Sequence, residues 1–363
     1  MTDGLYPTLR TPLCDLLGCE VPILLAGMGG VSRWELAADV ASAGGYPTPG
    51  MVREAPELIE REVQALRAAT DRPFALNLIP AATDPELLDA QIACCLDLDV
   101  RAFSFFWDVM PSAVERVKAA GCLVLHQVGT VQAARDAEAS GVDVLVAQGI
   151  EAGGHFHGRI GAFGLTAEIL SGTRLPVVVS GGIADGRGLA AALAMGAAGV
   201  HCGKAFLVTT ESFAHDMHKR RLVAAHAADT VLTDVFVLNW PRGTAVRVLA
   251  NSVTEVLGDR LLGHDPDTLP REPIAWDDDL PPALRHGFAP AHDDGGSGGD
   301  GVLCRSGRGP DCGRRSRRRS LAPDGGRGGS PAGPLPLRRL RAQGGTSWRG
   351  MTGLRAATLQ AMA

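Results

Sequence analysis

A histidine at the end of a glycine-rich turn is the feature of this chain best suited to chemistry. His155 ends the run QGIEAGGH at residues 148–155, which follows an apolar stretch, 142–147, that predicts a strand. Glycine lets the backbone approach a flat or phosphorylated ligand closely. Histidine is the side chain best suited to take a proton near neutral pH. The run, which includes Gly153 and Gly154, therefore predicts a site at the carboxyl end of a strand.

Two later glycine turns have the composition of a phosphate site. One comprises Ser180, Gly181 and Gly182, and the other contains Gly203 and Lys204. Barrels bind phosphate between the loops that follow their last two strands, through backbone N–H groups that a side chain would block. Two ordinary tight turns are the alternative interpretation.

Amide side chains and a further glycine turn stand at the ends of other expected strands. The turn comprises Gly27, Met28 and Gly29, and the amides are Asn77, Gln127 and Gln148. An amide offers both a donor and an acceptor to a polar ring or a hydroxylated chain. Any one such amide, taken alone, is more often a hydrogen-bonded structural residue than a ligand contact.

Eight short apolar stretches alternate with helical patterns through the first part of the chain. The expected strands are 22–28, 44–51, 74–79, 101–107, 123–128, 142–149, 176–182 and 198–206. Strands that alternate with amphipathic helices imply parallel pairing with crossovers, and eight such units predict a closed (β/α)8 barrel of the α/β class. An open doubly wound sheet is the alternative, but no acidic residue ends the second strand as a dinucleotide fingerprint requires.

Two prolines interrupt the second expected strand. Pro47 and Pro49 cannot donate ladder hydrogen bonds, which is unfavourable inside a barrel. The stretch therefore predicts either a distorted strand or an error in the sequence.

Several of these motifs together resemble one enzyme family. The runs QGIEAGGHFHG, AGMGGVS and FALNL are similar to the signatures of the nitronate monooxygenases, formerly called 2-nitropropane dioxygenases, which are FMN enzymes on a TIM barrel. The resemblance covers about residues 20–255. A sister group, the FMN-dependent enoyl-acyl-carrier-protein reductases, carries a similar run, so the resemblance implies cofactor and fold more strongly than substrate.

The resemblance implies FMN as cofactor, a nitronate or nitroalkane and O₂ as substrates, and a carbonyl compound and nitrite as products. His155 would take the proton next to the nitro group or steer the nitronate anion, and Gly181, Gly182 and Gly203 would hold the FMN phosphate. Lys204 stands where the family usually has threonine, so a cation would replace a hydroxyl there. A metal site from His155 and His157 would need a third ligand, and we expect none.

Two other functions are open. The first is an NAD(P)H-dependent enoyl-thioester reductase on the same fold. The second is a non-catalytic, flavin-poor product of a damaged gene, since the second strand and the C-terminal part depart from the family pattern.

Three regions are expected along the chain. Residues 1–210 would form the FMN-binding barrel, and 211–291 a small cover domain over its mouth, in which residues 247–251 are expected to open a helix. Residues 292–363 are dominated by Gly, Arg, Pro and Ser and lose hydrophobic periodicity, which predicts a disordered tail. A shifted reading frame is a second account, because codons allowed for 292–309 permit a family-like GDLEA segment in the neighbouring frame.

Bulk properties bound the partners. The chain has 363 residues, is 45% hydrophobic and carries a net charge of −5, which argues against a nucleic-acid partner. It contains neither an apolar run of membrane-spanning length nor a signal-peptide pattern, and its eight cysteines include no C-x-x-C pair. We therefore expect a cytoplasmic protein without a membrane partner. The oligomeric state is open.

Overall fold

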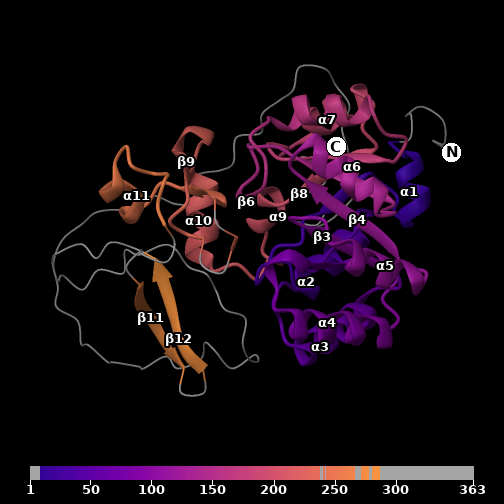
Figure 1. The fold of residues 1–363 in the computed structure, drawn as a ribbon, viewed down its shortest axis with the longest axis horizontal. Coiled ribbons are helices and arrows are strands. Elements are labelled where there is room, and N and C mark those ends of the chain that lie inside the picture. The colour runs from indigo at the N-terminus through magenta and orange to yellow at the C-terminus, as the bar shows by residue number, and fades with distance from the viewer. Residues whose placement is uncertain (1–8, 238–239, 242, 266–270, 278–279, 287–363) are drawn as a thin grey trace, which may run out of the picture.

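A curled parallel sheet forms the centre of the molecule (Figure 1). The computed structural model describes residues 9–237, 240–241, 243–265, 271–277 and 280–286. Seven parallel strands pair in the order β1-β8-β7-β5-β4-β3-β2. Their bounds are β1 (Ile23–Leu25), β2 (Leu76–Leu78), β3 (Ala102–Phe106), β4 (Leu123–Val128), β5 (Val144–Gln148), β7 (Val177–Ser180) and β8 (Gly199–Cys202).

Residues 46–50 close the ring between β1 and β2. Tyr46 exchanges backbone hydrogen bonds with β1, and the carbonyls of Pro47 and Pro49 accept from the backbone of Ala75 and Asn77 at 3.1 and 2.9 Å. The two prolines have carbonyls to offer but no N–H groups, so this stretch keeps its place in the barrel with an incomplete ladder. The distortion expected of the second strand is therefore present, and the (β/α)8 prediction is confirmed.

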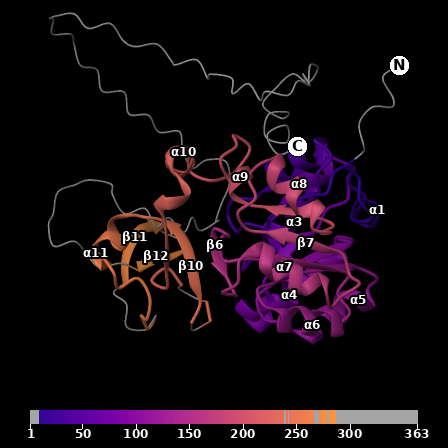
Figure 2. The same cartoon turned by 90° about the horizontal axis from the view of Figure 1, so that it is seen from above.

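Helices follow the strands along the outside of the sheet (Figure 2). They are α2 (Trp34–Ser42), α3 (Pro56–Ala69), α4 (Pro85–Asp97), α5 (Pro111–Ala119), α6 (Val131–Ala139), α7 (Ala162–Leu170), α8 (Gly186–Ala194) and α9 (Lys204–Leu207), with a 3-10 turn at Pro80–Ala82. A further helix, α1 (Pro12–Leu17), precedes β1 and packs against the barrel interior. The side chains of Asp84, Thr130 and Asp185 cap the backbone N–H groups that open α4, α6 and α8. Local sequence therefore fixes where these crossovers begin.

The core has two layers because successive strand residues face opposite sides of the sheet. Leu24, Leu125 and Val178 fill the barrel interior, where Leu13 and Leu17 of α1 pack against them. The alternate strand residues pack outward against the helices. The barrel is thus a filled core, as is usual for this architecture.

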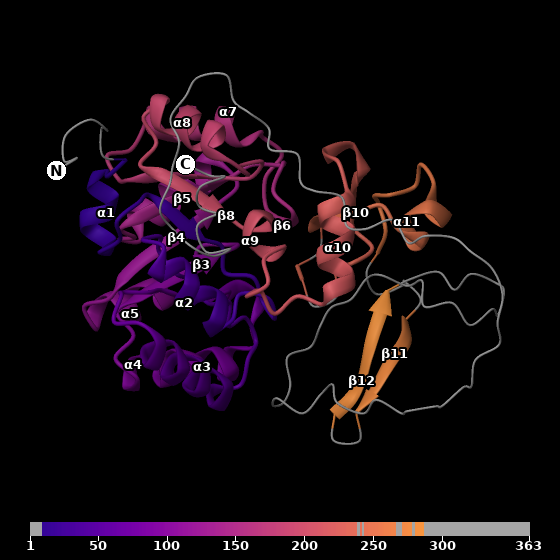
Figure 3. The ribbon, with the colours of Figure 1, turned by 180° about the vertical axis from the view of Figure 1, so that it is seen from behind.

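A smaller antiparallel sheet lies beside the barrel mouth. It has the order β6-β10-β9, with β6 (Gly154–Phe156), β10 (Ala245–Leu249) and β9 (Thr230–Thr233). Nearby are α10 (Asp216–Ala224), a 3-10 turn at Ala227–Asp229, α11 (Ser252–Leu257) and the hairpin β11 (Arg271–Asp277) and β12 (Leu280–His286). Since β6 comes from the connection after β5, it joins the two parts, and it lies at their junction in Figures 1 to 3.

One element differs from its sequence pattern. Residues 247–251 were expected to open a helix, but Arg247 and its neighbours form β10, and the helix α11 begins only after Asn251. Pairing explains the difference, because β10 bonds to β6 on one side and β9 on the other, and such tertiary contacts outweigh local propensity.

Residues 287–363 lie outside the described residues, and with them the expected tail. In the part of the chain that the structure describes, no helix is long and apolar enough to cross a membrane.

Candidate active site

A cavity of about 870 Å³ opens at the carboxyl ends of the barrel strands, between the barrel and the smaller sheet. This volume lies near the upper end of the roughly 300–1,000 Å³ typical of small-molecule sites. Every residue that the sequence predicted for the site lines it. They are Gly27, Met28, Gly29, Asn77, Gln127, Gln148, Gly153, Gly154, His155, Ser180, Gly181, Gly182, Gly203 and Lys204. Side chains from β10 and α10 line its outer part.

The His155 ring is held by two residues of the region after β9. Its Nε2 lies 3.3 Å from the carbonyl oxygen of Phe236, and the ring stacks on Trp240 with centroids 4.0 Å apart and planes 15° from parallel. A carbonyl can only accept, so Nε2 carries the hydrogen and Nδ1 carries the lone pair. Nδ1 has no partner among the described residues, which leaves one basic nitrogen for a ligand.

Burial makes His155 a neutral group. It lowers the pKa of the ring to about 4, the Phe236 hydrogen bond opposes this, and the positive charge of Arg53 adds a small decrease. The ring is therefore uncharged at neutral pH. A general base with a pKa near the working pH was expected, and the pKa in this structure is well below that.

Two of the amide side chains that line the cavity differ in their hydrogen bonding. The Nε2 of Gln148 donates to the carbonyl of His155 at 3.0 Å, which turns its buried Oε1 to a place without a hydrogen-bond partner. The Nδ2 of Asn77 donates to the carbonyl of Ser104 at 2.9 Å. Asn77 also crowds Gly27, where a β-carbon would lie 2.2 Å from the Asn77 β-carbon. Gln148 thus has an acceptor to offer a ligand, whereas the Asn77 donor is committed to the barrel.

The turn after β7 requires glycine. Gly181 and Gly182 have φ angles of 110° and 73°, which side chains other than glycine rarely adopt. Beside them, the Ser180 hydroxyl bonds to Nδ1 of His201 at 3.0 Å, and burial lowers the pKa of His201 to about 4. The structure therefore gives the Ser180 hydroxyl a protein partner, and leaves the glycine backbone open to a ligand.

Positive charge outweighs negative charge around the cavity. Lys204, Arg221 and Arg247 line it, and the single carboxylate among its described lining residues is Glu151, which accepts from the backbone N–H of Ala162 at 2.9 Å. Lys204 crosses over Gly153 and has no hydrogen-bond or ion-pair partner among the described residues. Burial and then the charge of Arg247 lower its pKa. Lys204 and Arg247 have no ion-pair partner among the described residues, and their two positive charges favour an anionic ligand.

Three aromatic side chains meet at the barrel mouth, and we refer to Phe106, Trp107 and Trp240 as the mouth cluster. Ring centroids lie 5.3 Å apart for Phe106 and Trp107, 5.1 Å for Trp107 and Trp240, and 6.0 Å for Phe106 and Trp240. Phe106 and Trp240 line the cavity. The mouth cluster gives the His155 side of the cavity an apolar, water-excluding surface.

Known proteins match this chain over most of its described length. The family model for nitronate monooxygenase matches residues 10–89 and 85–269. A nitronate monooxygenase of Paraburkholderia phytofirmans is 35% identical over 322 residues, which cover 76% of this chain and 84% of that protein. The chain belongs to the nitronate monooxygenase family.

Other relatives show how broad this similarity is. The (3aS,4S,5R,7aS)-5-hydroxy-7a-methyl-1-oxo-octahydro-1H-indene-4-carboxyl-CoA dehydrogenase of Mycobacterium tuberculosis is 36% identical over 62% of this chain, and the match spans 63% of that protein. FabK from Thermotoga maritima superposes with a TM-score of 0.64 at 34% identity, covering 69% of this chain and 78% of FabK. Nitroalkane oxidase from Streptomyces ansochromogenes gives 0.62 at 32%, covering 70% and 83%.

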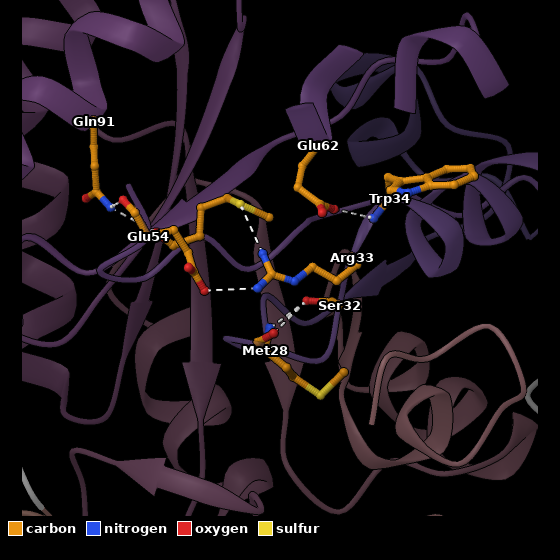
Figure 4. Close-up of polar contacts among 8 residues, drawn as sticks. Met28, Ser32, Arg33, Trp34, Glu54, Glu62 and Gln91 are labelled. Atoms are coloured by element: carbon orange, nitrogen blue, oxygen red, sulfur yellow. Dashed lines mark hydrogen bonds and ion pairs between the residues drawn. The ribbon is translucent and has the colours of Figure 1, made fainter. Parts of the chain in front are cut away.

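In this member of the nitronate monooxygenase family, a buried polar network supports the first glycine turn (Figure 4). The Ser32 hydroxyl bonds to the backbone N–H and carbonyl of Met28 at 2.7 and 3.1 Å. Next along the chain, Arg33 pairs with Glu54 at 3.1 Å, and both side chains are more than nine-tenths buried. Gln91 donates to the backbone carbonyl of Glu54 at 2.7 Å. We call Arg33, Glu54 and Gln91 the buried network.

The sequence pointed to the glycines and amides of this family member and missed the mouth cluster, His201 and Arg247. Trp107 is the last residue of an expected strand, which was a usable signal. Trp240 gave none, because it lies 85 positions after His155 in a stretch without a motif. His157 pairs with Asp108 at 3.2 Å and does not bond to His155. In the described part of the chain no three His, Cys, Asp or Glu side chains gather as a metal site.

Proposed function

We propose that this protein is an FMN-dependent oxidoreductase that uses O₂ to oxidise alkyl nitronates, and more slowly nitroalkanes, to carbonyl compounds and nitrite. The observation that carries the proposal is a neutral His155, with its lone pair at Nδ1, inside a cavity whose described lining carries more positive than negative side chains. Membership of the family and the likeness to the Streptomyces nitroalkane oxidase support it.

The residues of the cavity suit FMN. The unpartnered Oε1 of Gln148 is an acceptor for a ring N–H. The backbone N–H groups of Gly181 and Gly182 have no hydrogen-bond partner among the described residues and line the same cavity as Lys204 and Arg247, and a phosphate there would compensate these two cations. When bound, FMN supplies the redox chemistry, taking electrons from the substrate and passing them to O₂.

The protein's own residues set which substrate reacts. His155 Nδ1 can take the proton from the carbon next to a nitro group, but a base with a pKa of about 4 holds that proton weakly. A nitronate arrives without this proton and carries the negative charge that Lys204, Arg247 and Arg53 attract. We therefore assign the anionic nitronate as the better substrate and the neutral nitroalkane as the slower one.

Two measurements test this proposal. The purified protein is reconstituted with excess FMN, its released flavin is identified by chromatography, and O₂ uptake and nitrite are followed with ethylnitronate and with nitroethane. We expect FMN rather than FAD, and faster turnover of ethylnitronate. Bound FMN without O₂ uptake on either substrate would refute the activity, and a colourless protein after reconstitution would favour the flavin-poor alternative.

A second candidate function has one observation in its favour. The outer rim of the cavity carries Lys204, Arg221 and Arg247, which would suit the phosphates of a coenzyme A thioester, and the Mycobacterium tuberculosis relative is named for a carboxyl-CoA substrate. An enoyl-thioester reductase would bleach its flavin rapidly with NADH or NADPH under anaerobic conditions. Reoxidation of that flavin by crotonyl-CoA, without nitronate turnover, would establish this function instead.

A further inference from the structure

Two residues with a strained backbone conformation contact the same side chain, Trp240, at the barrel mouth. Among the described residues, three that are not glycine have φ in the left-handed region, namely Arg53 at 54°, Asp99 at 55° and Trp107 at 82°. Asp99 lies in the turn that follows α4. Arg53 and Trp107 come from separate connections, yet both contact Trp240. Such conformations persist where surrounding contacts impose them, and they gather at functional sites.

The contacts of Trp240 surround its ring with residues of the barrel. The Arg53 guanidinium carbon lies 5.5 Å from the ring centroid, a cation–π distance. Trp107 meets it edge-on at 5.1 Å and Phe106 lies at 6.0 Å. Arg53 is itself anchored, since its Nε donates to the carbonyl of Ala82 at 2.6 Å. The barrel therefore holds Trp240 through three side chains, one of which, Arg53, is itself bonded to the barrel backbone.

The same indole covers His155. Its ring stacks on the imidazole at 4.0 Å, and Phe236, four positions earlier, supplies the carbonyl that receives the Nε2 hydrogen. Both ring contacts of His155 thus come from a stretch about 80 residues away, while Gln148 of the barrel and the pairing of β6 with β10 of the smaller sheet fix only its backbone. Without that stretch, nothing among the described residues would select one imidazole tautomer.

We propose that Trp240 is a positioning residue for His155. The indole of Trp240 packs against Arg53 and Trp107, which together we call the seat, and it holds the imidazole with its hydrogen on Nε2 and its lone pair on Nδ1. This inference rests on the proposed function for its kinetic consequence, but its structural content can be measured without a substrate.

The proposal has a defined consequence for titration. The charged and titratable groups around the stacked pair are Arg53 on one side and, behind Trp107, His157 with Asp108. Burial is the main cause that lowers the pKa of His155 to about 4 from an ordinary 6.5. Removal of the indole would admit water, so the pKa should rise, by about one unit or more. The remaining charges are unchanged by this substitution.

Nuclear magnetic resonance of protein labelled with ¹⁵N-histidine tests the proposal directly. Long-range couplings report which ring nitrogen carries the hydrogen, and His155→Asn identifies the resonances of His155 among the ten histidines. We expect the Nε2–H tautomer in the parent protein, a mixture of tautomers with a raised pKa in Trp240→Leu, and parent-like behaviour in Trp240→Phe. An unchanged tautomer and pKa in Trp240→Leu would overturn the proposal.

Leucine keeps most of the buried volume, so this variant should fold, and FMN content and circular dichroism check that it does. If Trp240→Leu nevertheless fails to fold, Trp107→Phe and Arg53→Lys, which weaken the seat and leave the indole, must shift the His155 titration, or the proposal is refuted. Phe213→Ala is the matched control, because Phe213 is 57% exposed and does not line the cavity.

Kinetics separates this proposal from the proposed function. We expect kcat on nitroethane to fall about 10- to 100-fold in Trp240→Leu, the scale of a misplaced catalytic group, with a smaller change on ethylnitronate. If the resonance result holds and no nitronate is turned over by the parent protein, the proposed function fails and the positioning role stands. A kcat loss with an unaltered tautomer and pKa would refute the positioning role alone.

Discussion

The two sides of the cavity are held in different ways. On one side, the Ser32 hydroxyl bonds to the Met28 turn, and the adjoining buried network is held by the Arg33–Glu54 ion pair and the Gln91 hydrogen bond, all within the first strands and helices of the barrel. On the other side, His155 depends on Trp240 and Phe236, which belong to a distant part of the chain. The comparison teaches that the surface we propose for a flat cofactor is built into the barrel, whereas the proposed proton acceptor is completed from outside it.

The largest expected effect comes from a substitution in the buried network, on the barrel side of the cavity. Arg33→Met removes one partner of the buried Arg33–Glu54 pair, a change that costs about 3–5 kcal/mol in the free energy of unfolding. Urea unfolding of the FMN-free protein measures this. Arg116→Met is the control, because Arg116 and Asp89 form an exposed pair whose loss should cost at most about 1 kcal/mol. Equal costs for the two variants would show that the buried network does not hold this side.

Acid should weaken the barrel through two buried histidines. Burial lowers the pKa of His126 and of His201 to about 4, whereas the unfolded chain takes up these protons near 6.5. Folded-state stability is therefore complete above about pH 6.5 and is lost as the pH falls from there toward 4, by about 4 kcal/mol for the pair at pH 5. Urea unfolding at pH 7 and pH 5 measures the loss, and a flat profile between them would contradict it.

His155→Ala breaks the other side of the comparison. Turnover of neutral nitroethane should fall at least about 10²-fold, the usual contribution of a positioned base, while ethylnitronate should lose less because it needs no deprotonation. The barrel side is untouched, so FMN should stay bound. His226→Ala, an exposed histidine that does not line the cavity, is the control. Equal, small losses on both substrates would remove His155 from the base role.

The barrel could be predicted from the sequence because its signals are local. Strand β4 was expected at 123–128 and lies there, and the glycine turns gather where the strands end. The alternation of strands and helices and the glycine turns are set by neighbours in the chain. Even the proline-broken second strand kept its place, because the barrel needs only the carbonyls of Pro47 and Pro49 there.

The completion of the site could not be predicted, because it depends on contacts between distant segments. Nothing near Trp240 in the sequence indicates that it stacks on His155. Residue 247 was expected in a helix because the strands that pair with it, β6 and β9, are separate segments whose pairing leaves no local signal. The low pKa of His155 follows from burial by residues some 80 positions away. The local pattern indicated His155 as a candidate, and tertiary contacts set the tautomer and the pKa of its ring.

The smallest expected effect concerns the part of the cavity that we propose for the FMN phosphate. There the barrel and the smaller sheet each contribute a cation. Lys204 belongs to the barrel and Arg247 to the smaller sheet, and the charge of Arg247 helps to lower the pKa of Lys204. We propose that bound FMN phosphate relieves this repulsion, so Lys204→Met should weaken FMN binding by about tenfold, which is about 1.4 kcal/mol. Flavin fluorescence titration measures the affinity.

Riboflavin, which has the same ring and no phosphate, is the internal control for that titration. Its affinity should be unchanged in Lys204→Met, and the FMN difference between parent and variant should shrink as salt is raised, because screening acts on exposed charge. Lys204→Thr, which restores the residue usual in the family, should lie between the two, since a hydroxyl replaces one hydrogen bond without the charge. An equal loss for riboflavin and FMN would show that Lys204 supports the fold of the turn, and that the phosphate is held from the Arg247 side alone.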